Sequence, residues 1–207
     1  MLQAIIFDFD GVLADTLGDM LRFAAEACRQ LGHPCQPTPA DLDALEQMSF
    51  VDYGRQLGIP EHLLGEFTNY CLECFSARAQ PPQIFPGLAE VLRQLASSYP
   101  LAIVTGNTAA TVQATLEGHN LEGLFKVIVD VHQPGKRFEK ITRAAAMLGV
   151  PVGATLVVGD AVSDIRASAQ AGALSGAVGW GHQSLSRLGQ ANPDYLFKTP
   201  SDLLDIL

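Results

Sequence analysis

Two aspartates separated by one residue, Asp8 and Asp10, close the apolar run that begins at Ala4. Carboxylates are costly where a strand is about to be buried, so this pair needs a chemical reason. Side chains alternate along a strand, which directs both carboxylates to one side and Phe9 to the other. A carboxylate can act as a nucleophile or move a proton, and Gly11 lets the backbone turn sharply beside a bound group. The spacing therefore predicts two carboxylates with different chemical tasks.

Polar residues follow three further apolar runs in the same way. Taken alone, each is explained by a helix cap, a turn or a solvated loop. Ligands of parallel α/β sheets, however, bind beyond the carboxyl ends of the strands, so their convergence predicts a site at that edge. These residues are Thr105, Gly106, Asn107, Lys136, Asp160 and Asp164.

The chemistry that this set predicts is phosphoryl transfer. Four carboxylates at one edge repel one another unless they are protonated or bind a cation, and an all-oxygen set suits Mg²⁺. One aspartate of the first pair would attack phosphorus while the other handles the proton of the leaving group. Thr105, the amides near Gly106 and Asn107, and the Lys136 ammonium would hold phosphoryl oxygens as negative charge builds.

The elements that must position these residues alternate between short apolar runs and amphipathic helical patterns. This alternation predicts an α/β fold with a parallel sheet and crossover helices. We expect strands over residues 4–9, 101–105, 127–130 and 155–159, with a weaker last strand over 174–178. We expect helices over residues 87–97, 109–118, 139–149 and 162–172.

One connection is too long for a single crossover, which needs about 30 residues. The excess between the first two strands is almost wholly helical in pattern, over residues 19–32, 40–58 and 61–79. Residues 81–87, Pro-Pro-Gln-Ile-Phe-Pro-Gly, then read as a stiff linker. We therefore expect a core domain over residues 1–14 and 85–207, with a helical cap domain over 15–84.

The composition excludes several kinds of partner. The chain of 207 residues is 48% hydrophobic and has a formal net charge of −9, and its 13 basic residues are scattered. This argues against binding to nucleic acid or an anionic membrane. We expect a monomer or homodimer that binds a small phosphorylated metabolite.

Four cysteines, Cys28, Cys35, Cys71 and Cys74, lie in a chain too large to need disulfides. We favour free thiols, buried or half-buried, over a zinc site, because Cys28 and Cys35 lack ligand spacing. Met1 leads into a strand pattern with no basic leader. Both observations favour the cytoplasm.

Three motifs resemble those of the haloacid dehalogenase-like hydrolase superfamily, in its phosphoglycolate phosphatase and β-phosphoglucomutase branch. "DFDGVLADT" is similar to the first motif, "VTGN" to the second and "VVGDAVSDIRASAQAG" to the fourth. The similarity spans essentially the whole chain. It implies a Rossmann-like, doubly wound parallel sheet with an inserted helical cap. Asp10 argues for phosphate chemistry, because the dehalogenases of this superfamily lack the second aspartate.

The resemblance also implies a division of labour among the site residues. Asp8 would be the nucleophile and Asp10 the general acid and base. Mg²⁺ would be held by the Asp8 carboxylate, the Asp10 backbone carbonyl and Asp160, with Asp164 in support. The residues expected to bind phosphate are Thr105, Gly106, Asn107 and Lys136.

The third motif departs from the family pattern. It usually reads Lys-Pro, but Arg137 stands here after Lys136, and Lys140 is a weaker substitute for the motif lysine. In the fourth motif Ala161 replaces a common serine. Neither change touches the expected nucleophile, so we expect a phosphatase acting through an aspartyl-phosphate, with phosphoglycolate as the family-weighted substrate. A phosphosugar mutase or phosphotransferase, or a non-catalytic module that binds a phospho-ligand, remains an alternative.

Overall fold

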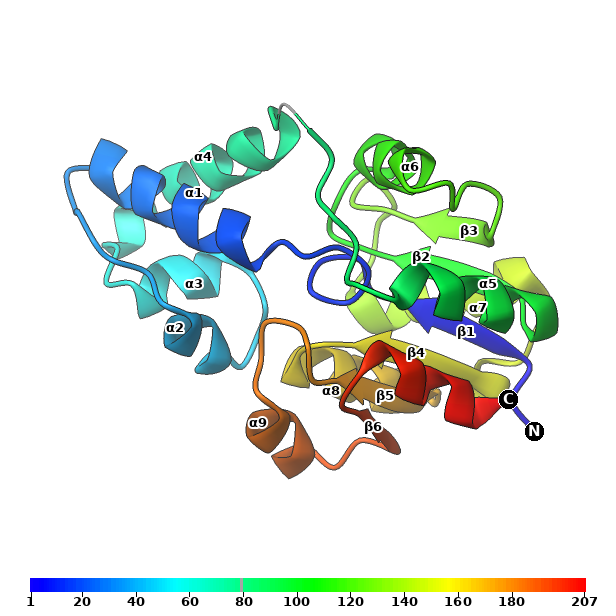
Figure 1. The fold of residues 1–207 in the computed structure, drawn as a ribbon. Coiled ribbons are helices and arrows are strands. Elements are labelled where there is room, and N and C mark those ends of the chain that lie inside the picture. Colours follow the sequence, from blue (N-terminus) through cyan, green and yellow to red (C-terminus); the bar gives the residue numbers. More distant parts are fainter. Residues whose placement is uncertain (79) are drawn as a thin grey trace. The chain divides into compact units, whose positions relative to one another are not determined.

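The chain folds around one six-stranded parallel sheet with helices on both faces (Figure 1). The structure is a computed structural model that describes residues 1–78 and 80–207. Along the sheet the strands run in the order β3-β2-β1-β4-β5-β6. The strands are β1 (Ala4–Phe7), β2 (Leu101–Val104), β3 (Phe125–Val129), β4 (Thr155–Gly159), β5 (Leu174–Val178) and β6 (Tyr195–Phe197).

The helices of the described residues fall into two sets. Those between β1 and β2 are α1 (Leu17–Gln30), α2 (Pro39–Asp43), α3 (Phe50–Gln56), α4 (Leu64–Ser76) and α5 (Leu88–Ser98). Those beyond β2 are α6 (Ala109–Gly118), α7 (Arg137–Leu148), α8 (Val162–Ala171) and α9 (Leu185–Gln190). Short 3₁₀ turns cover Glu61–Leu63, Val152–Ala154 and Pro200–Ile206. None of these helices is long and apolar enough to cross a membrane.

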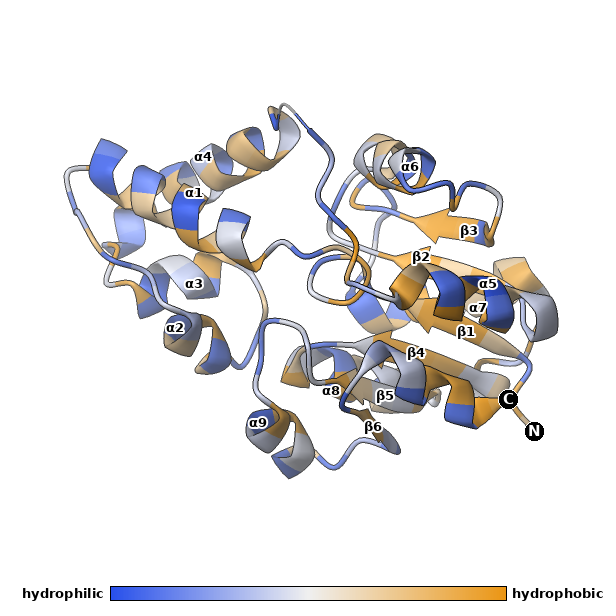
Figure 2. Cartoon of the chain, in the orientation of Figure 1, coloured by the Kyte–Doolittle hydropathy of each residue, from blue (hydrophilic) through white to orange (hydrophobic). Residues whose placement is uncertain are grey.

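The alternation of side chains along the central strands separates two hydrophobic cores. Ile5 and Phe7 of β1 belong to the core beneath α5 and α6, whereas Ile6 belongs to the core beneath α7 and α8. Strands β1, β2 and β4 are buried throughout and are coloured as hydrophobic in Figure 2. This confirms the predicted α/β fold with a doubly wound parallel sheet, in which strands covered on both faces read as continuous apolar runs.

The chain divides into two compact units. The larger unit comprises Met1–Asp15 and Pro81–Leu207, and the smaller unit comprises Thr16–Gln80. These boundaries differ from those expected at 14/15 and 84/85. Residues 81–84 belong with the larger unit because Ile84 forms a β-bridge with Ala14 and the Asp15 N–H donates to the Gln83 carbonyl (2.8 Å).

The smaller unit is helical, with its own core around Phe23, Tyr53 and Phe67. The pattern over residues 40–58 is interrupted, because residues 44–49 separate α2 from α3. The last residue of the pattern over 61–79, Ala79, lies outside the described residues.

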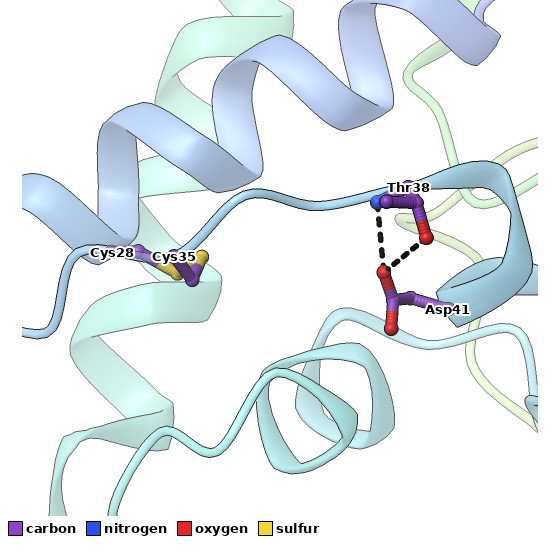
Figure 3. Close-up of a disulfide and its surroundings, with 4 residues drawn as sticks. All are labelled: Cys28, Cys35, Thr38 and Asp41. Carbon is purple, nitrogen blue, oxygen red and sulfur yellow. Dashed lines mark hydrogen bonds between the residues drawn. A yellow bond between two sulfur atoms is a disulfide. The ribbon is translucent and has the colours of Figure 1, made fainter.

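A disulfide between Cys28 and Cys35 corrects the expectation of four free thiols (Figure 3). Helix α1 ends at Gln30, and Gly32 turns the chain back with a φ of 74°. The two Cα atoms come within 5.9 Å of each other, which is disulfide spacing. The other two cysteines, Cys71 and Cys74, are free as expected. Since Cys28 and Cys35 are bonded to each other, they cannot also serve as zinc ligands.

Candidate active site

Three carboxylates meet at the carboxyl edge of the sheet, within the larger unit. Oxygens of Asp8, Asp160 and Asp164 lie within 4.8 Å of one another. Asp8 follows β1, and Asp160 follows its neighbour β4, while Asp164 lies in the first turn of α8. The convergence follows from the sheet order, because β1 and β4 are hydrogen-bonded neighbours and both end at this edge.

Each of these carboxylates is held by donors from the surrounding backbone or side chains. The Phe9 N–H donates to Asp8 Oδ1 (2.8 Å), and the N–H groups of Asp160 and Ala161 both donate to Asp164 Oδ2 (3.2 Å). Asp164 thus receives the free N–H groups at the start of α8, where Ala161 has no hydroxyl to offer. Burial raises the pKa of Asp8 and of Asp164. Repulsion from Asp160 adds to both shifts, and repulsion from Asp8 also raises the pKa of Asp164, while Arg137 opposes both.

Three glycines leave the space that the carboxylates fill. A Cβ at Gly11 would lie 2.0 Å from Asp160 Oδ2, and one at Gly181 would lie 2.3 Å from Asp160 Cβ. A Cβ at Gly159 would lie 2.3 Å from Asp164 Cβ. Gly11 also has a φ of 73°, a backbone conformation that side chains rarely adopt. The sharp turn predicted after Asp10 is therefore present, and its glycine also provides close packing against Asp160.

Asp10 stands apart from the three-carboxylate cluster. Strand β1 ends at Phe7, so neither aspartate lies within the strand itself, and Phe9 is buried in the core beneath α5. Asp10 Oδ2 accepts a short hydrogen bond from Asn107 Nδ2. Asp8 therefore belongs to the three-carboxylate cluster, whereas Asp10 is hydrogen-bonded to Asn107 in the loop that follows β2.

The loop after β2 brings together the other predicted residues of the second motif. Thr105 is buried, and its Oγ1 accepts from the Asn107 N–H (2.9 Å). Gly106 is exposed, with open space around its Cα. The simple explanation of Thr105 and Asn107 as helix caps does not apply, because Thr108 is the N-cap of α6 and accepts from Thr111 N.

The structure places Lys136 away from these residues. Its side chain is exposed and makes no hydrogen bond or ion pair with any described residue, while its backbone N–H donates to Glu139 Oε2 (2.6 Å). Lys140, the weaker candidate, donates to the Asp130 carbonyl (2.8 Å). The cation that reaches the carboxylates is Arg137, the residue at the position of the family's proline. Its Nη2 lies 3.0 Å from Asp8 Oδ2 and its Nε lies 2.7 Å from Asp164 Oδ1.

A second cation, His182, was not among the predicted residues. The backbone N–H of His182 donates to Asp160 Oδ2 (2.7 Å), and the ring Nδ1 lies 2.8 Å from the same oxygen. The side chains of His182 and Asp160 are each only 2% exposed. Burial lowers the pKa of His182, but Asp160 outweighs burial and raises it to about 9. Next to it, Gln183 Oε1 accepts from Val162 N at the start of α8 (2.7 Å). Both residues could have been found from the sequence, because they follow the expected strand over residues 174–178 and so lie at the same edge of the sheet.

The comparisons with known proteins agree with this architecture. The family model described as haloacid dehalogenase-like hydrolase matches residues 5–178. A phosphoglycolate phosphatase from Synechococcus elongatus is 33% identical, with 98% of this chain and 96% of the relative covered. A pyrophosphatase from Bacillus velezensis is 27% identical, with 99% and 96% covered.

A solved structure of a haloacid dehalogenase-like hydrolase from Streptococcus pneumoniae superposes with a TM-score of 0.86. It is 22% identical, and the match covers 99% of this chain and 98% of the other, so it supports the fold alone. The chain therefore belongs to the haloacid dehalogenase-like hydrolases. The family and the fold expected from the three motifs are confirmed, and the relatives agree with the predicted enzyme class, a phosphatase of this type.

Proposed function

We propose that this hydrolase is a Mg²⁺-dependent phosphatase that cleaves a small phosphomonoester through an aspartyl-phosphate on Asp8. The observation that carries the proposal is the meeting of Asp8 with Asp160 and Asp164 at one sheet edge. Asp8 is partly accessible, with 13% of its side chain exposed, while Asp160 and Asp164 are buried. An accessible carboxylate backed by two buried ones suits a nucleophile beside a metal site.

The donor set fits Mg²⁺. All three side chains offer carboxylate oxygens, the ligands that this ion prefers, and they already lie within a few ångströms of one another. We propose that Asp8 and Asp160 hold the ion with the Asp10 backbone carbonyl, and that Asp164 supports them. When bound, Mg²⁺ would neutralise the repulsion between carboxylates and polarise a phosphoryl oxygen.

In the first step a carboxylate oxygen of Asp8 attacks phosphorus. The bond between phosphorus and Asp8 forms while the ester P–O bond breaks, and the leaving oxygen takes a proton from the Asp10 carboxyl group. Asn107, bonded to Asp10 Oδ2, orients that carboxyl group. The products are the free alcohol, the aspartyl-phosphate and an ionised Asp10.

In the second step water attacks the same phosphorus. Asp10 takes a proton from the water, the P–O bond to Asp8 breaks, and inorganic phosphate leaves. Both carboxyl groups are thereby restored to their starting states. We propose that Thr105, Gly106 and Asn107 bind the phosphoryl oxygens, as the resemblance implies. Lys136, which the resemblance also implied, is left out because its side chain is exposed to solvent.

The relatives support the choice of substrate to test. One relative is named a phosphoglycolate phosphatase, so a small phosphorylated carboxylic acid is the first substrate to test. A mutase would pass the same phosphoryl group to a sugar hydroxyl instead of water. Product analysis with a hexose 1-phosphate separates the two, because isomerisation without phosphate release would support the mutase.

We propose that the protein acts in the cytoplasm as a monomer or homodimer. The cysteine usage no longer supports this location, since Cys28 and Cys35 form a disulfide and reducing compartments rarely keep one. The location therefore stays a prediction.

The function is tested by phosphate release from a panel of small phosphomonoesters, with Mg²⁺ and with a chelator. We expect turnover that needs Mg²⁺ in the wild type and none in Asp8→Asn, whose isosteric side chain keeps the fold. The matched control is Asp15→Asn, at the end of the same segment. Full turnover by Asp8→Asn would refute the mechanism, and no turnover across the panel would support the non-catalytic module.

A further inference from the structure

The start of α7 decides which basic residue faces the carboxylates. Lys136 is the N-cap, in an extended conformation with φ −72° and ψ 166°, and Arg137 is the first helical residue. Arg137 and Lys140 are three residues apart on this helix, so they lie on the same face. The Arg137 side chain reaches Asp8 and Asp164, and the Lys140 side chain reaches the Asp130 carbonyl. Lys136 lies just before the helix, and its side chain is exposed to solvent.

The Arg137 guanidinium bridges two carboxylates with two different nitrogens. Nη2 contacts Asp8 at 3.0 Å and Nε contacts Asp164 at 2.7 Å. The second contact is an ion pair without a directed hydrogen bond, because the buried Nε has no partner in hydrogen-bonding geometry. A lysine ammonium is a single point charge, whereas a guanidinium presents donors along a planar fork. Holding both carboxylates at once therefore needs an arginine.

The Arg137 side chain is placed to act on the reacting group itself. It is 26% exposed, and the two carboxylates that it contacts are 13% and 5% exposed, so the ion pairs are partly shielded from water. A guanidinium is cationic at every working pH. Its positive charge lies 3.0 Å from Asp8 Oδ2 and therefore favours the ionised, nucleophilic form of that carboxylate.

We propose that Arg137, and not Lys136, is the cation of the active site, where it orients Asp8 and shares Asp8 and Asp164 with the divalent metal. The catalytic part of this inference rests on the proposed function. Its second part concerns binding alone: the guanidinium contacts Asp8, a proposed ligand of Mg²⁺, and Asp164, which would support the ligands, so Arg137 lowers the affinity of the site for Mg²⁺. A neutral residue at position 137 would leave the carboxylates without a neighbouring positive charge. The site would then bind Mg²⁺ more tightly.

The test compares Arg137→Met, Arg137→Lys and the matched control Lys136→Met in the full chain. Turnover is measured with para-nitrophenyl phosphate, and Mg²⁺ binding is measured by calorimetry without substrate. We expect Arg137→Met to lower kcat by about 100-fold or more, the loss typical of a removed electrostatic contact at a reacting group. Arg137→Lys should recover part of kcat, and Lys136→Met should keep it within about threefold, as an exposed side chain allows.

Mg²⁺ binding provides a readout that does not depend on turnover. We expect Arg137→Met to bind Mg²⁺ several-fold more tightly than the wild type, and Lys136→Met to bind it equally. A merely structural Arg137 would weaken Mg²⁺ binding when lost, so weaker or unchanged affinity in Arg137→Met would overturn the inference. If Arg137→Met does not fold, Arg137→Gln serves in the same comparison.

The two proposals fail in different ways. A large loss of kcat in Lys136→Met with normal kcat in Arg137→Met would overturn the inference about Arg137 and leave the phosphatase intact. A wild type that releases no phosphate from any ester would refute the proposed function. In that case the Mg²⁺ titration of Arg137→Met still decides whether the guanidinium shares the metal carboxylates.

Discussion

At the scale of single residues, the site depends on how buried carboxylates are compensated. Asp160 and Asp164 are 1% and 4% exposed, and such groups are costly unless they are paired or hydrogen-bonded. His182 pairs with Asp160, while Arg137 and two backbone N–H groups serve Asp164. The carboxylates are thus stabilised by the loop after β5, the start of α7 and the backbone after β4, which ties these three segments to one another.

Replacing His182 by alanine should strongly destabilise the larger unit. The change leaves the Asp160 carboxylate buried without its cation, and removal of one partner from a buried ion pair costs about 3–5 kcal/mol. Unfolding in urea measures the loss in the free energy of unfolding. The control is His132→Ala, at an exposed site. A loss below about 1 kcal/mol in His182→Ala, the size of an average substitution, would contradict a compensating role.

Gly11 should tolerate no side chain. In Gly11→Ala the Cβ would meet Asp160 Oδ2 at 2.0 Å, and the φ of 73° strains any residue with a Cβ by about 1–3 kcal/mol. We expect a lower free energy of unfolding and weaker Mg²⁺ binding, since Asp160 must move. The matched control, Gly118→Ala in α6, has open space and should be neutral or slightly stabilising. Normal Mg²⁺ binding by Gly11→Ala would show that the turn does not set the position of Asp160.

The meeting of three of the four expected aspartates could be predicted from the sequence, whereas the cations that contact them could not. Asp8, Asp160 and Asp164 meet because parallel neighbouring strands end at one edge, and strand patterns are readable from the chain. Choosing between Lys136 and Arg137 needs the exact first residue of α7, because each residue turns the helix by about 100°. Helix ends are uncertain by one or two residues, which is enough to reverse the choice.

At the scale of elements, the strands and helices of the sheet follow their patterns closely. The expected strand over 155–159 and helix over 109–118 match β4 and α6, whereas α7 begins at Arg137 instead of residue 139. Strand β6 was not predicted, because it is short and two of its three residues are exposed at the edge of the sheet. Strand β6 therefore lacks the continuous apolar run by which a buried strand is recognised in a sequence.

The disulfide at the end of α1 could not be predicted because it depends on a turn. Cys28 and Cys35 lie seven positions apart in the sequence, and the reversal at Gly32 brings them together. Next to it, Thr38 N and Oγ1 both donate to Asp41 Oδ2 (2.8 and 2.7 Å), which fixes the start of α2 (Figure 3). The segment between α1 and α2 is thus held at both ends.

Loss of this disulfide should destabilise the smaller unit by about 2–3 kcal/mol, the chain-entropy value for a short loop. We expect Cys35→Ser to lower the melting temperature, and a reductant to lower that of the wild type to the same value. Cys74→Ser removes a free thiol and is the matched control. Equal melting temperatures for wild type and Cys35→Ser under oxidising conditions would contradict a stabilising disulfide.

At the scale of the whole molecule, the net charge of −9 makes local positive charge decisive. An anionic substrate is repelled by the molecule as a whole, so its binding needs local positive charge at the sheet edge, such as Arg137 or the proposed Mg²⁺. The three-carboxylate cluster, Asp10 and Arg137 all belong to the larger unit, which therefore holds the proposed chemistry by itself. That the smaller unit acts as a cap over the site stays a prediction of the sequence.

The central claim is that Asp8 carries the phosphoryl group during turnover. The most direct test is to quench the wild type with acid while it turns over a phosphomonoester, and to analyse its peptides by mass spectrometry. We predict that the peptide containing Asp8 gains the mass of one phosphoryl group, that fragmentation places this group on Asp8 and not on Asp10, and that Asp8→Asn shows none. Turnover with the phosphoryl group on any other residue would contradict the account.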